Sequence, residues 1–128
     1  MVGRVRQFVQ GTNTPLIADG DTGYGGLLNV DFTIRGYEAA GAQAIQIEDQ
    51  EMPKKCGHTP NRRVIATRDM CRKIEVAVNA RARDDTLIVA RTDARTGLGL
   101  DEAIARGKEF AKAGADVIFV EAPESEEE

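Results

Sequence analysis

One segment of the chain, Lys54-Lys55-Cys56-Gly57-His58, places a thiol between two lysines and an imidazole. A thiol with cationic neighbours can have a lowered pKa and act as an acid, a base or a nucleophile. The histidine is the only one in the chain, and a lone loop histidine is also commonly a solvated or structural residue. The segment therefore indicates an enzyme and leaves the role of the thiol open.

Acidic residues follow each of four short apolar runs in the chain. Their carboxylates would repel one another if they met without a cation. Oxygen donors of this kind suit Mg2+, and also Mn2+. The pattern predicts a metal site, although polar residues are also common at exposed strand ends. The residues concerned are Asp19 and Asp21, Glu48 and Asp49, Arg91 with Asp93, and Glu121.

Strand-like and helical patterns alternate along the chain. The apolar runs occupy residues 15–18, 44–47, 87–90 and 117–120, and the helical patterns occupy residues 2–9, 30–40, 68–82 and 102–113. Alternation of this kind predicts an α/β fold with a parallel sheet and crossover helices. The carboxyl ends of the strands then meet on one side of the sheet, where such folds carry their chemistry. Because the runs are almost entirely apolar, we expect both faces of the sheet to be covered.

Several residues mark the expected ends of these elements. Thr67 and Asp101 are the expected N-caps of the third and fourth helices. Gly41 and Gly114 follow helical patterns at equivalent points of a weak internal repeat, and both fit a left-handed position just after a helix. Ser125 precedes three glutamates and predicts the start of a further helix, with a disordered acidic tail as the alternative.

Glycines surround Asp21 in the segment of residues 19–26. Their number would allow the backbone to approach a ligand closely, but the spacing matches neither a dinucleotide fingerprint nor a P-loop. A simple turn explains the spacing equally well. Tyr24, in the same segment, is expected either to line a pocket or to pack. Cys71 is expected to pack in the core or at a helix interface.

Composition limits the class of protein. The 128 residues suffice for one domain, and 41% hydrophobic with 30% charged residues is ordinary for a globular protein. The net charge of -4 argues against nucleic-acid binding, and the basic cluster at residues 54, 55, 62 and 63 is better matched to nearby acids. No apolar segment approaches the roughly 20 residues of a membrane helix. Two dissimilar cysteines suggest reduced thiols, so we expect a cytoplasmic protein, with an organelle of a eukaryote as the alternative. We expect no membrane or nucleic-acid partner.

Five motifs resemble the isocitrate lyase/phosphoenolpyruvate mutase superfamily. They are Asp-Gly-Asp-Thr-Gly-Tyr-Gly at 19–25, Ile-Glu-Asp-Gln at 47–50, Lys-Lys-Cys-Gly-His at 54–58, Ala-Arg-Thr-Asp-Ala at 90–94 and Val-Glu-Ala-Pro at 120–123. The resemblance implies that residues 1–128 form one partial (β/α)8 TIM barrel domain, comprising strands two to five. It also implies a Mg2+-dependent carbon–carbon lyase for a small hydroxy acid, usually a homotetramer. Both ends of the chain are expected to be cut relative to a complete barrel.

The resemblance also assigns roles to residues at the metal and the substrate. Asp19 would bind the metal directly, while Asp21 and Glu48 would contact it mainly through water. Arg91 would bind the carboxylate of the oxo-acid product and the developing oxyanion. Tyr24 is a further candidate for substrate contact.

The same resemblance assigns the proton chemistry to the segment at residues 54–58. Cys56 would protonate the departing carboxylate, with Lys54 and His58 on a gating loop and tuning the thiol. Gly57 and His58 would also contact the substrate. Glu121 would join the acid–base and hydrogen-bond network.

Three residues favour one branch of the superfamily. Cys56 favours the lyases, because the phosphoenolpyruvate mutase branch proper lacks this cysteine. Gln46 replaces the histidine typical of methylisocitrate lyases, and Gly20 replaces their common alanine. The residues at these three positions are more similar to those of 2,3-dimethylmalate lyase and its broad-specificity relatives. The alternatives are a carboxyphosphonoenolpyruvate or phosphoenolpyruvate phosphonomutase-like isomerase, and an inactive barrel fragment acting only by association.

Overall fold

The computed structural model describes residues 1–56, 59 and 61–128. Gly57 and His58, with their predicted roles, lie outside the described residues. The elements are α1 (Val2–Gly11), β1 (Ile17–Asp19), α2 (Leu27–Ala39), β2 (Ala44–Glu48), α3 (Thr67–Ala80), β3 (Leu87–Thr92), α4 (Ala94–Leu98), α5 (Leu100–Lys112) and β4 (Val117–Val120). No helix among these is both long enough and apolar enough to cross a membrane.

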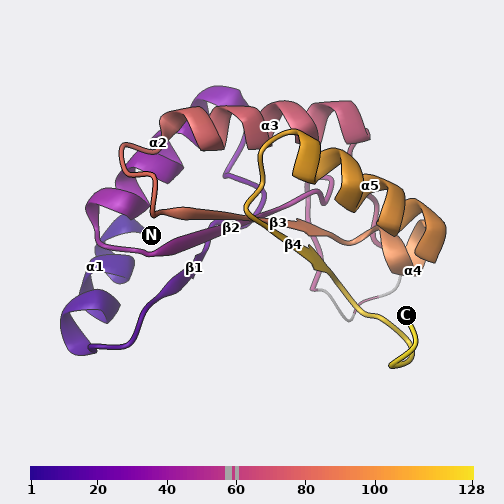
Figure 1. The fold of residues 1–128 in the computed structure, drawn as a ribbon, viewed down its shortest axis with the longest axis horizontal. Coiled ribbons are helices and arrows are strands. Elements are labelled where there is room, and N and C mark those ends of the chain that lie inside the picture. The colour runs from indigo at the N-terminus through magenta and orange to yellow at the C-terminus, as the bar shows by residue number, and fades with distance from the viewer. Residues whose placement is uncertain (57–58, 60) are drawn as a thin grey trace.

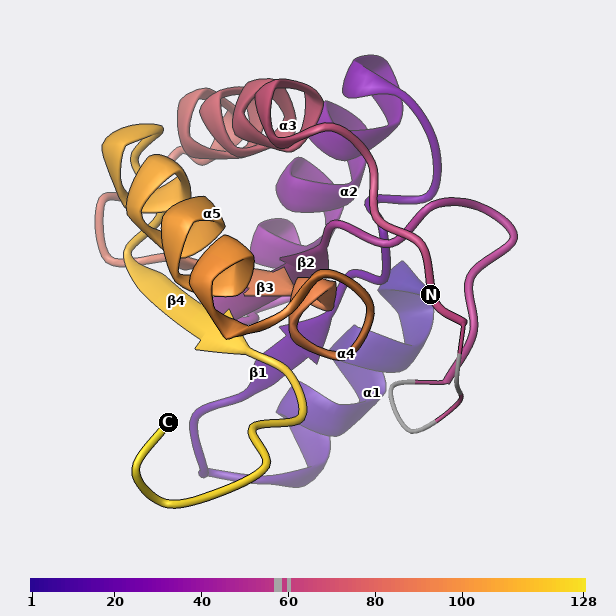
Figure 2. The ribbon, with the colours of Figure 1, turned by 90° about the vertical axis from the view of Figure 1, so that its right-hand side faces the viewer.

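The four strands form one parallel sheet in the order β1-β2-β3-β4 (Figure 1). This confirms the alternating α/β topology expected from the sequence. Sequential parallel strands need crossover connections, which α2, α3 and α5 supply. Because neighbouring strands run in chain order, the carboxyl ends of all four meet on one side of the molecule. Figure 2 is turned toward that side, where α4 and the segment after β2 also lie.

Helices cover only one face of this sheet. The arch formed by α2, α3 and α5 lies over it, and α1 packs against α2 (Figure 1). The other face carries exposed apolar side chains, namely Ile17, Leu87, Val117 and Phe119. The expectation of a sheet covered on both faces is therefore wrong for the described residues. Crossovers of one hand place every connecting helix on the same side, so the second face has no partner among these elements.

Strand alternation decides which side chains reach the open face. Ile45, Ile47 and Ile88 are fully buried against the helices. Residues between them point the other way, so Glu48 and Arg91, which are register partners in β2 and β3, lie on the open face. The sheet thus brings the last side chains of neighbouring strands together.

Helix ends match the sequence in part. Gly41 and Gly114 both have φ of 101°, as predicted for residues just after a helix. Both predicted N-caps are wrong: Thr67 lies inside α3 behind Ala66, and Asp101 lies in the first turn of α5. The short helix α4 was not predicted, and the residues from 121 onward form a turn rather than a helical start.

A buried carboxylate ties α2 to the connection between α3 and β3. The Glu38 carboxylate accepts hydrogen bonds from the backbone N–H groups of Ala82 and Arg83 at 2.8 and 2.9 Å, and from the Thr86 hydroxyl at 2.8 Å. Burial alone would raise the pKa of Glu38, but these hydrogen bonds outweigh burial and lower it. The charged form is therefore the one that stabilises the fold.

Glu38→Gln is expected to lower the free energy of unfolding by about 1–3 kcal/mol at pH 7, because an amide NH2 then faces backbone N–H donors. The folded-state pKa lies below the unfolded value, so this stabilisation is present above the unfolded pKa and is lost as pH falls through the folded pKa. Denaturant unfolding at pH 7 and pH 3 measures the difference, with the exposed Glu75→Gln as control. An equal deficit at both pH values would contradict the assignment.

Candidate active site at the strand ends

Arg91, near the carboxyl end of β3, is surrounded by acids. Its Nε and Nη2 donate to Asp93 at 3.0 and 2.9 Å. Nη1 lies 3.8 Å from Glu48, and Nε lies 3.6 Å from Glu121. Burial disfavours the cation, but these carboxylates outweigh burial and raise the pKa of Arg91. Acids at the carboxyl ends of β2 and β4 are therefore joined by the guanidinium at the end of β3, as their positions in the sequence predict.

Glu48, which also faces Arg91, is almost fully buried, at 2% exposure. Its Oε1 has no hydrogen-bond partner among the described residues. Burial raises the pKa of Glu48, and the charges of Lys54 and Arg91 offset only part of this effect. A buried carboxylate oxygen without a hydrogen bond is costly, and the cation near this oxygen is the Lys54 ammonium, 3.4 Å away.

The Lys54 ammonium already lies between two of the acids. Its Nζ is 2.7 Å from Asp21 Oδ2 and 3.4 Å from Glu48 Oε1. Burial opposes its charge, but the carboxylates outweigh burial and raise the pKa of Lys54. Two carboxylates from different strand ends thus approach closely enough to share one cation.

The segment after β1 sets the positions of Asp19 and Asp21. The Asp21 N–H donates to Asp19 Oδ1 at 2.8 Å, and Asp21 has a φ of 57°. Gly20 donates its N–H to the Gln46 carbonyl at 2.7 Å. A Cβ at Gly20 would lie 2.8 Å from that same oxygen, so the two strands approach too closely there for alanine without a shift. From α3, Lys73 Nζ donates to the Thr22 carbonyl at 2.8 Å.

The metal prediction fits this arrangement in part. No group of three or more His, Cys, Asp and Glu side chains suited to a metal ion occurs within the described part of the chain, so the predicted trio is not gathered as a ready-made site. Mg2+, however, commonly uses one or two carboxylates and keeps several waters. The connected groups comprise five carboxylates and three cations, which leaves them two positive charges short. They are Asp19, Asp21, Glu48, Asp93 and Glu121 against Lys54, Arg62 and Arg91.

Cys56 is exposed, and its neighbour Lys55 is held by two hydrogen bonds with the Gln50 side chain, both at 3.0 Å. Lys55 Nζ donates to the Asn61 carbonyl at 3.2 Å. Both lysine ammonium groups of the motif therefore bind oxygen acceptors in this structure. Lys54 was expected to lie beside the Cys56 thiol, but it contacts acids instead.

Tyr24 lies on the α2 side of the β1 end. Its hydroxyl is 2.9 Å from that of Tyr37, which in turn donates to the Asp19 carbonyl at 3.3 Å. Tyr24 also lines an apolar recess of about 340 Å³ with Phe32 and the N-terminal Met1. This placement supports the packing role for Tyr24 as readily as a role in substrate contact.

A buried ionic network beneath the cluster was not predicted from the sequence. Asp49 is fully buried and accepts from the Thr92 hydroxyl at 2.7 Å, the Asp93 N–H at 2.9 Å and Arg106 Nη1 at 3.1 Å. Burial raises the pKa of Asp49, and these donors offset part of the effect. Asp49 stands in one of the motifs, but only the fold reveals that Arg106 of α5 is its ion-pair partner.

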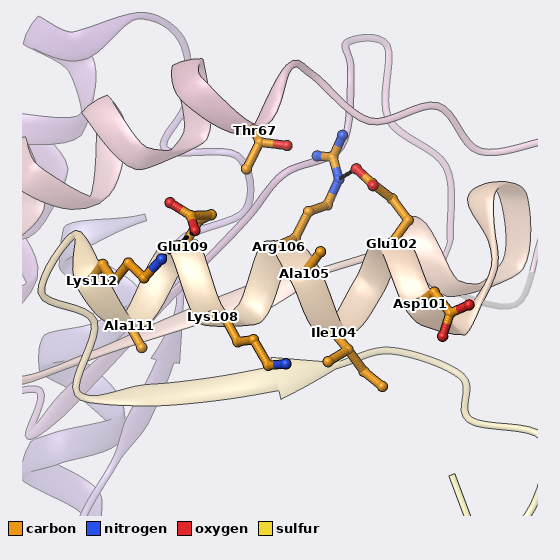
Figure 3. Close-up of a pocket in the computed structure, with 10 residues that line it drawn as sticks. All are labelled: Thr67, Asp101, Glu102, Ile104, Ala105, Arg106, Lys108, Glu109, Ala111 and Lys112. Atoms are coloured by element: carbon orange, nitrogen blue, oxygen red, sulfur yellow. Dashed lines mark hydrogen bonds and ion pairs between the residues drawn. The ribbon is translucent and has the colours of Figure 1, made fainter.

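A larger cavity elsewhere does not compete as a reaction site. It has a volume of about 780 Å³ and runs along α5. Figure 3 shows its charged side chains, among which Arg106 pairs with Glu102 at 2.9 Å and Lys112 pairs with Glu109 at 2.7 Å. Four of its charged side chains are thus paired with one another, and none of its lining residues belongs to the motifs at the strand ends.

A parallel sheet with its helices on one face, and with carboxylates and an arginine at its strand ends, has the arrangement found in part of an α/β barrel. A family model described as "Phosphoenolpyruvate phosphomutase" matches residues 1–128. The chain belongs to this family, within the PEP mutase/isocitrate lyase superfamily, and its described elements form part of a barrel.

Two curated relatives are similar over most of the chain. A 2,3-dimethylmalate lyase of Eubacterium barkeri is 52% identical over 128 residues, which cover all of this chain and 44% of that protein. A 2-methylisocitrate lyase of Aeropyrum pernix is 54% identical over 114 residues, which cover 89% of this chain and 36% of that protein. The chain thus spans less than half the length of these relatives.

Solved structures agree with this placement. A crystal structure of 2,3-dimethylmalate lyase superimposes with a TM-score of 0.94 at 38% identity, covering 99% of this chain and 43% of that one. A phosphonopyruvate hydrolase in complex with oxalate and Mg2+ gives a TM-score of 0.85 at 37% identity, covering 96% and 42%.

Proposed function

We propose that this chain carries the strand-end half of the active site of a Mg2+-dependent carbon–carbon lyase. The substrate would be a 2-hydroxy dicarboxylate or tricarboxylate of the 2,3-dimethylmalate or 2-methylisocitrate type. One observation carries the proposal. The buried Glu48 carboxylate, with one oxygen lacking a hydrogen bond, lies between the Lys54 ammonium and the Arg91 guanidinium.

The acids at the ends of β1 and β2 would hold the metal. Asp21 and Glu48 already share one cation, and Asp19 is tied to Asp21 through its backbone. A bound Mg2+ would supply Lewis-acid stabilisation of negative charge on the substrate oxygens. The carboxylates alone would repel a negatively charged substrate from the strand ends. The positive charges of Lys54 and Arg91 are therefore needed as well.

The remaining chemistry falls to side chains of this chain. Arg91 would bind the carboxylate of the 2-oxo acid and the adjacent developing oxyanion. The substrate hydroxyl would lose its proton to a carboxylate of the network that includes Glu121. The C2–C3 bond then breaks, and its electron pair passes to the departing carboxylate as an enolate. Cys56 would donate the proton that converts this enolate to the free carboxylate product.

The loop that carries Cys56 would close over the bound substrate. Lys54 and His58 would tune the thiol there, and Gly57, His58 and Tyr24 would contact the substrate. A closing loop excludes water from the enolate. Because the described sheet has an uncovered face, we expect the 128 residues alone to be inactive and catalysis to require further strands. We expect the active protein to be a homo-oligomer, such as a homotetramer. A cytoplasmic location agrees with this metabolic role.

A phosphonomutase-like isomerase is the second candidate, because the matching family model is described as a phosphomutase. Cys56 argues for the lyase, since a proton donor has no function in moving a phosphoryl group within one molecule.

Product analysis with three substrates separates the two functions. The protein, purified as its gene encodes it, is incubated with Mg2+ and 2,3-dimethylmalate, 2-methylisocitrate or phosphoenolpyruvate. The lyase releases pyruvate from one of the first two, with propionate or succinate in equal amount. Conversion of phosphoenolpyruvate to phosphonopyruvate, without release of pyruvate from either hydroxy acid, would establish the isomerase instead.

A further inference from the structure

We infer that Arg62 and Asp93 form a clasp that positions the Arg91 guanidinium, so that Arg62 is a positioning residue of the anion-binding arginine. The inference rests on the function proposed above for Arg91. None of the roles assigned from the motifs includes Arg62 or Asp93.

The geometry of the clasp is a carboxylate shared by two arginines. Asp93 Oδ2 accepts from Arg91 Nε at 3.0 Å, and Oδ1 accepts from Arg91 Nη2 at 2.9 Å. The same Oδ1 accepts from Arg62 Nη1 at 3.2 Å. The Asp93 and Arg62 side chains are 0% and 1% exposed. Arg91 is thereby held along one edge, which leaves Nη1 directed toward Glu48 and the open side of the sheet.

Charge explains why a second arginine matters. A single buried carboxylate bound in two places to Arg91 would neutralise that guanidinium and leave it little attraction for an anion. Arg62 supplies a second positive charge to the same carboxylate. The group of Arg62, Asp93 and Arg91 then carries one net positive charge, and Arg91 is the member that faces the acids at the strand ends.

Arg62 is held in place by few other contacts. Its Nη2 donates to the Thr96 hydroxyl in α4, while its buried Nε has no partner among the described residues. A side chain buried to this degree with an unsatisfied N–H is unfavourable for stability alone. Its position is better explained by its effect on Asp93 and Arg91.

Arg62 also connects two parts of the site. It stands in the segment that leads from Cys56 to α3, and an isolated bridge between Gln50 and Val64 closes this segment at its base. The clasp therefore fixes the far end of the Cys56 segment to the residues after β3. A change at Arg62 should alter ligand binding at Arg91 without touching any proposed metal ligand.

The neighbouring Arg63 provides a matched control. Its side chain is 78% exposed and pairs at 2.8 Å with Glu51, which is 45% exposed. Exposed ion pairs of this kind contribute little to stability. Arg63→Met removes the same chemical group, one residue away, from outside the clasp.

The test compares Arg62→Met, Arg62→Lys and Arg63→Met in the protein purified as its gene encodes it. Calorimetry measures the affinity for oxalate in the presence of Mg2+, and NMR follows the Arg91 Nε–H resonance without ligand. We expect Arg62→Met to weaken oxalate binding by roughly tenfold and to shift the Arg91 resonance. Arg62→Lys should recover part of the affinity, and Arg63→Met should match the wild type in both measurements.

The two measurements separate the possible failures. If Arg62→Met and Arg62→Lys both match Arg63→Met in affinity and in the Arg91 resonance, the clasp has no positioning role. If the wild type itself does not bind oxalate with Mg2+, the proposed function fails, and the Arg91 resonance alone then decides the clasp. If Arg62→Met does not fold, the comparison of Arg62→Lys with Arg63→Met gives the answer.

Discussion

Arg91→Met is expected to lower kcat/KM by about 10³-fold. The substitution removes the only guanidinium that contacts Asp93, Glu48 and Glu121 together within the described residues. The substrate carboxylate would lose its cation, and three acids would be left facing one another. Arg91→Lys should recover little activity, because an ammonium cannot hold Asp93 through two parallel hydrogen bonds.

Steady-state kinetics on the hydroxy acid substrate proposed above measures the effect of Arg91→Met. Arg95→Met is the control, since Arg95 lies on nearby α4 and pairs with Glu124 and Glu128 instead. Circular dichroism checks that both variants fold. A variant Arg91→Met that kept more than about a tenth of wild-type kcat/KM would show that substrate carboxylate binding depends on another residue.

Cys56→Ser is expected to reduce kcat by about 10²–10⁴-fold, which is the usual range for a lost general acid. A serine hydroxyl is a far weaker acid than a thiol, so the enolate would wait for a proton from water. Mg2+ affinity should not change, because Cys56 is exposed and is not among the residues proposed to hold the metal.

The control for this variant is Cys71→Ser. Cys71 is partly buried in α3 and packs against the hydrophobic core, so its substitution should cost some stability and little kcat. Metal affinity is measured by calorimetry in parallel with kcat. A Cys56→Ser enzyme with full activity would exclude the thiol as proton donor.

The sequence was sufficient to predict the strand ends. Acids and Arg91 directly follow apolar runs, and parallel strands in chain order necessarily bring such residues to one side. Glu48, Arg91 and Glu121 meet for this reason. The strand positions were predicted to within two residues because apolar runs bounded by polar residues reflect burial directly.

Contacts that depend on side-chain length and loop course were not predictable. The sequence suggested that the Lys54 ammonium lies beside the Cys56 thiol. In the structure it forms ion pairs with Asp21 and Glu48 instead. Arg62 was recognised only as part of a basic cluster with acids nearby. Its actual partner, Asp93, is 31 residues further along the chain.

Local helix signals were also misleading. Thr67 and Asp101 have side chains suited to N-caps, but Ala66 and Gly99 occupy the cap positions. A side-chain capping contribution of about 1 kcal/mol therefore did not decide where either helix begins. The open face of the sheet was missed because an apolar strand has the same composition whether or not a second layer covers it.

The most direct test of the account is the dependence of cleavage on the metal. The protein, purified as its gene encodes it, is stripped with EDTA and assayed for pyruvate release from 2,3-dimethylmalate and 2-methylisocitrate while Mg2+ is restored stepwise. We predict no release without Mg2+, saturable recovery with it, and no recovery in Glu48→Gln. Equal release from the stripped protein, or none from either substrate at saturating Mg2+, would contradict the assignment of the strand-end cluster to a Mg2+-dependent carbon–carbon lyase.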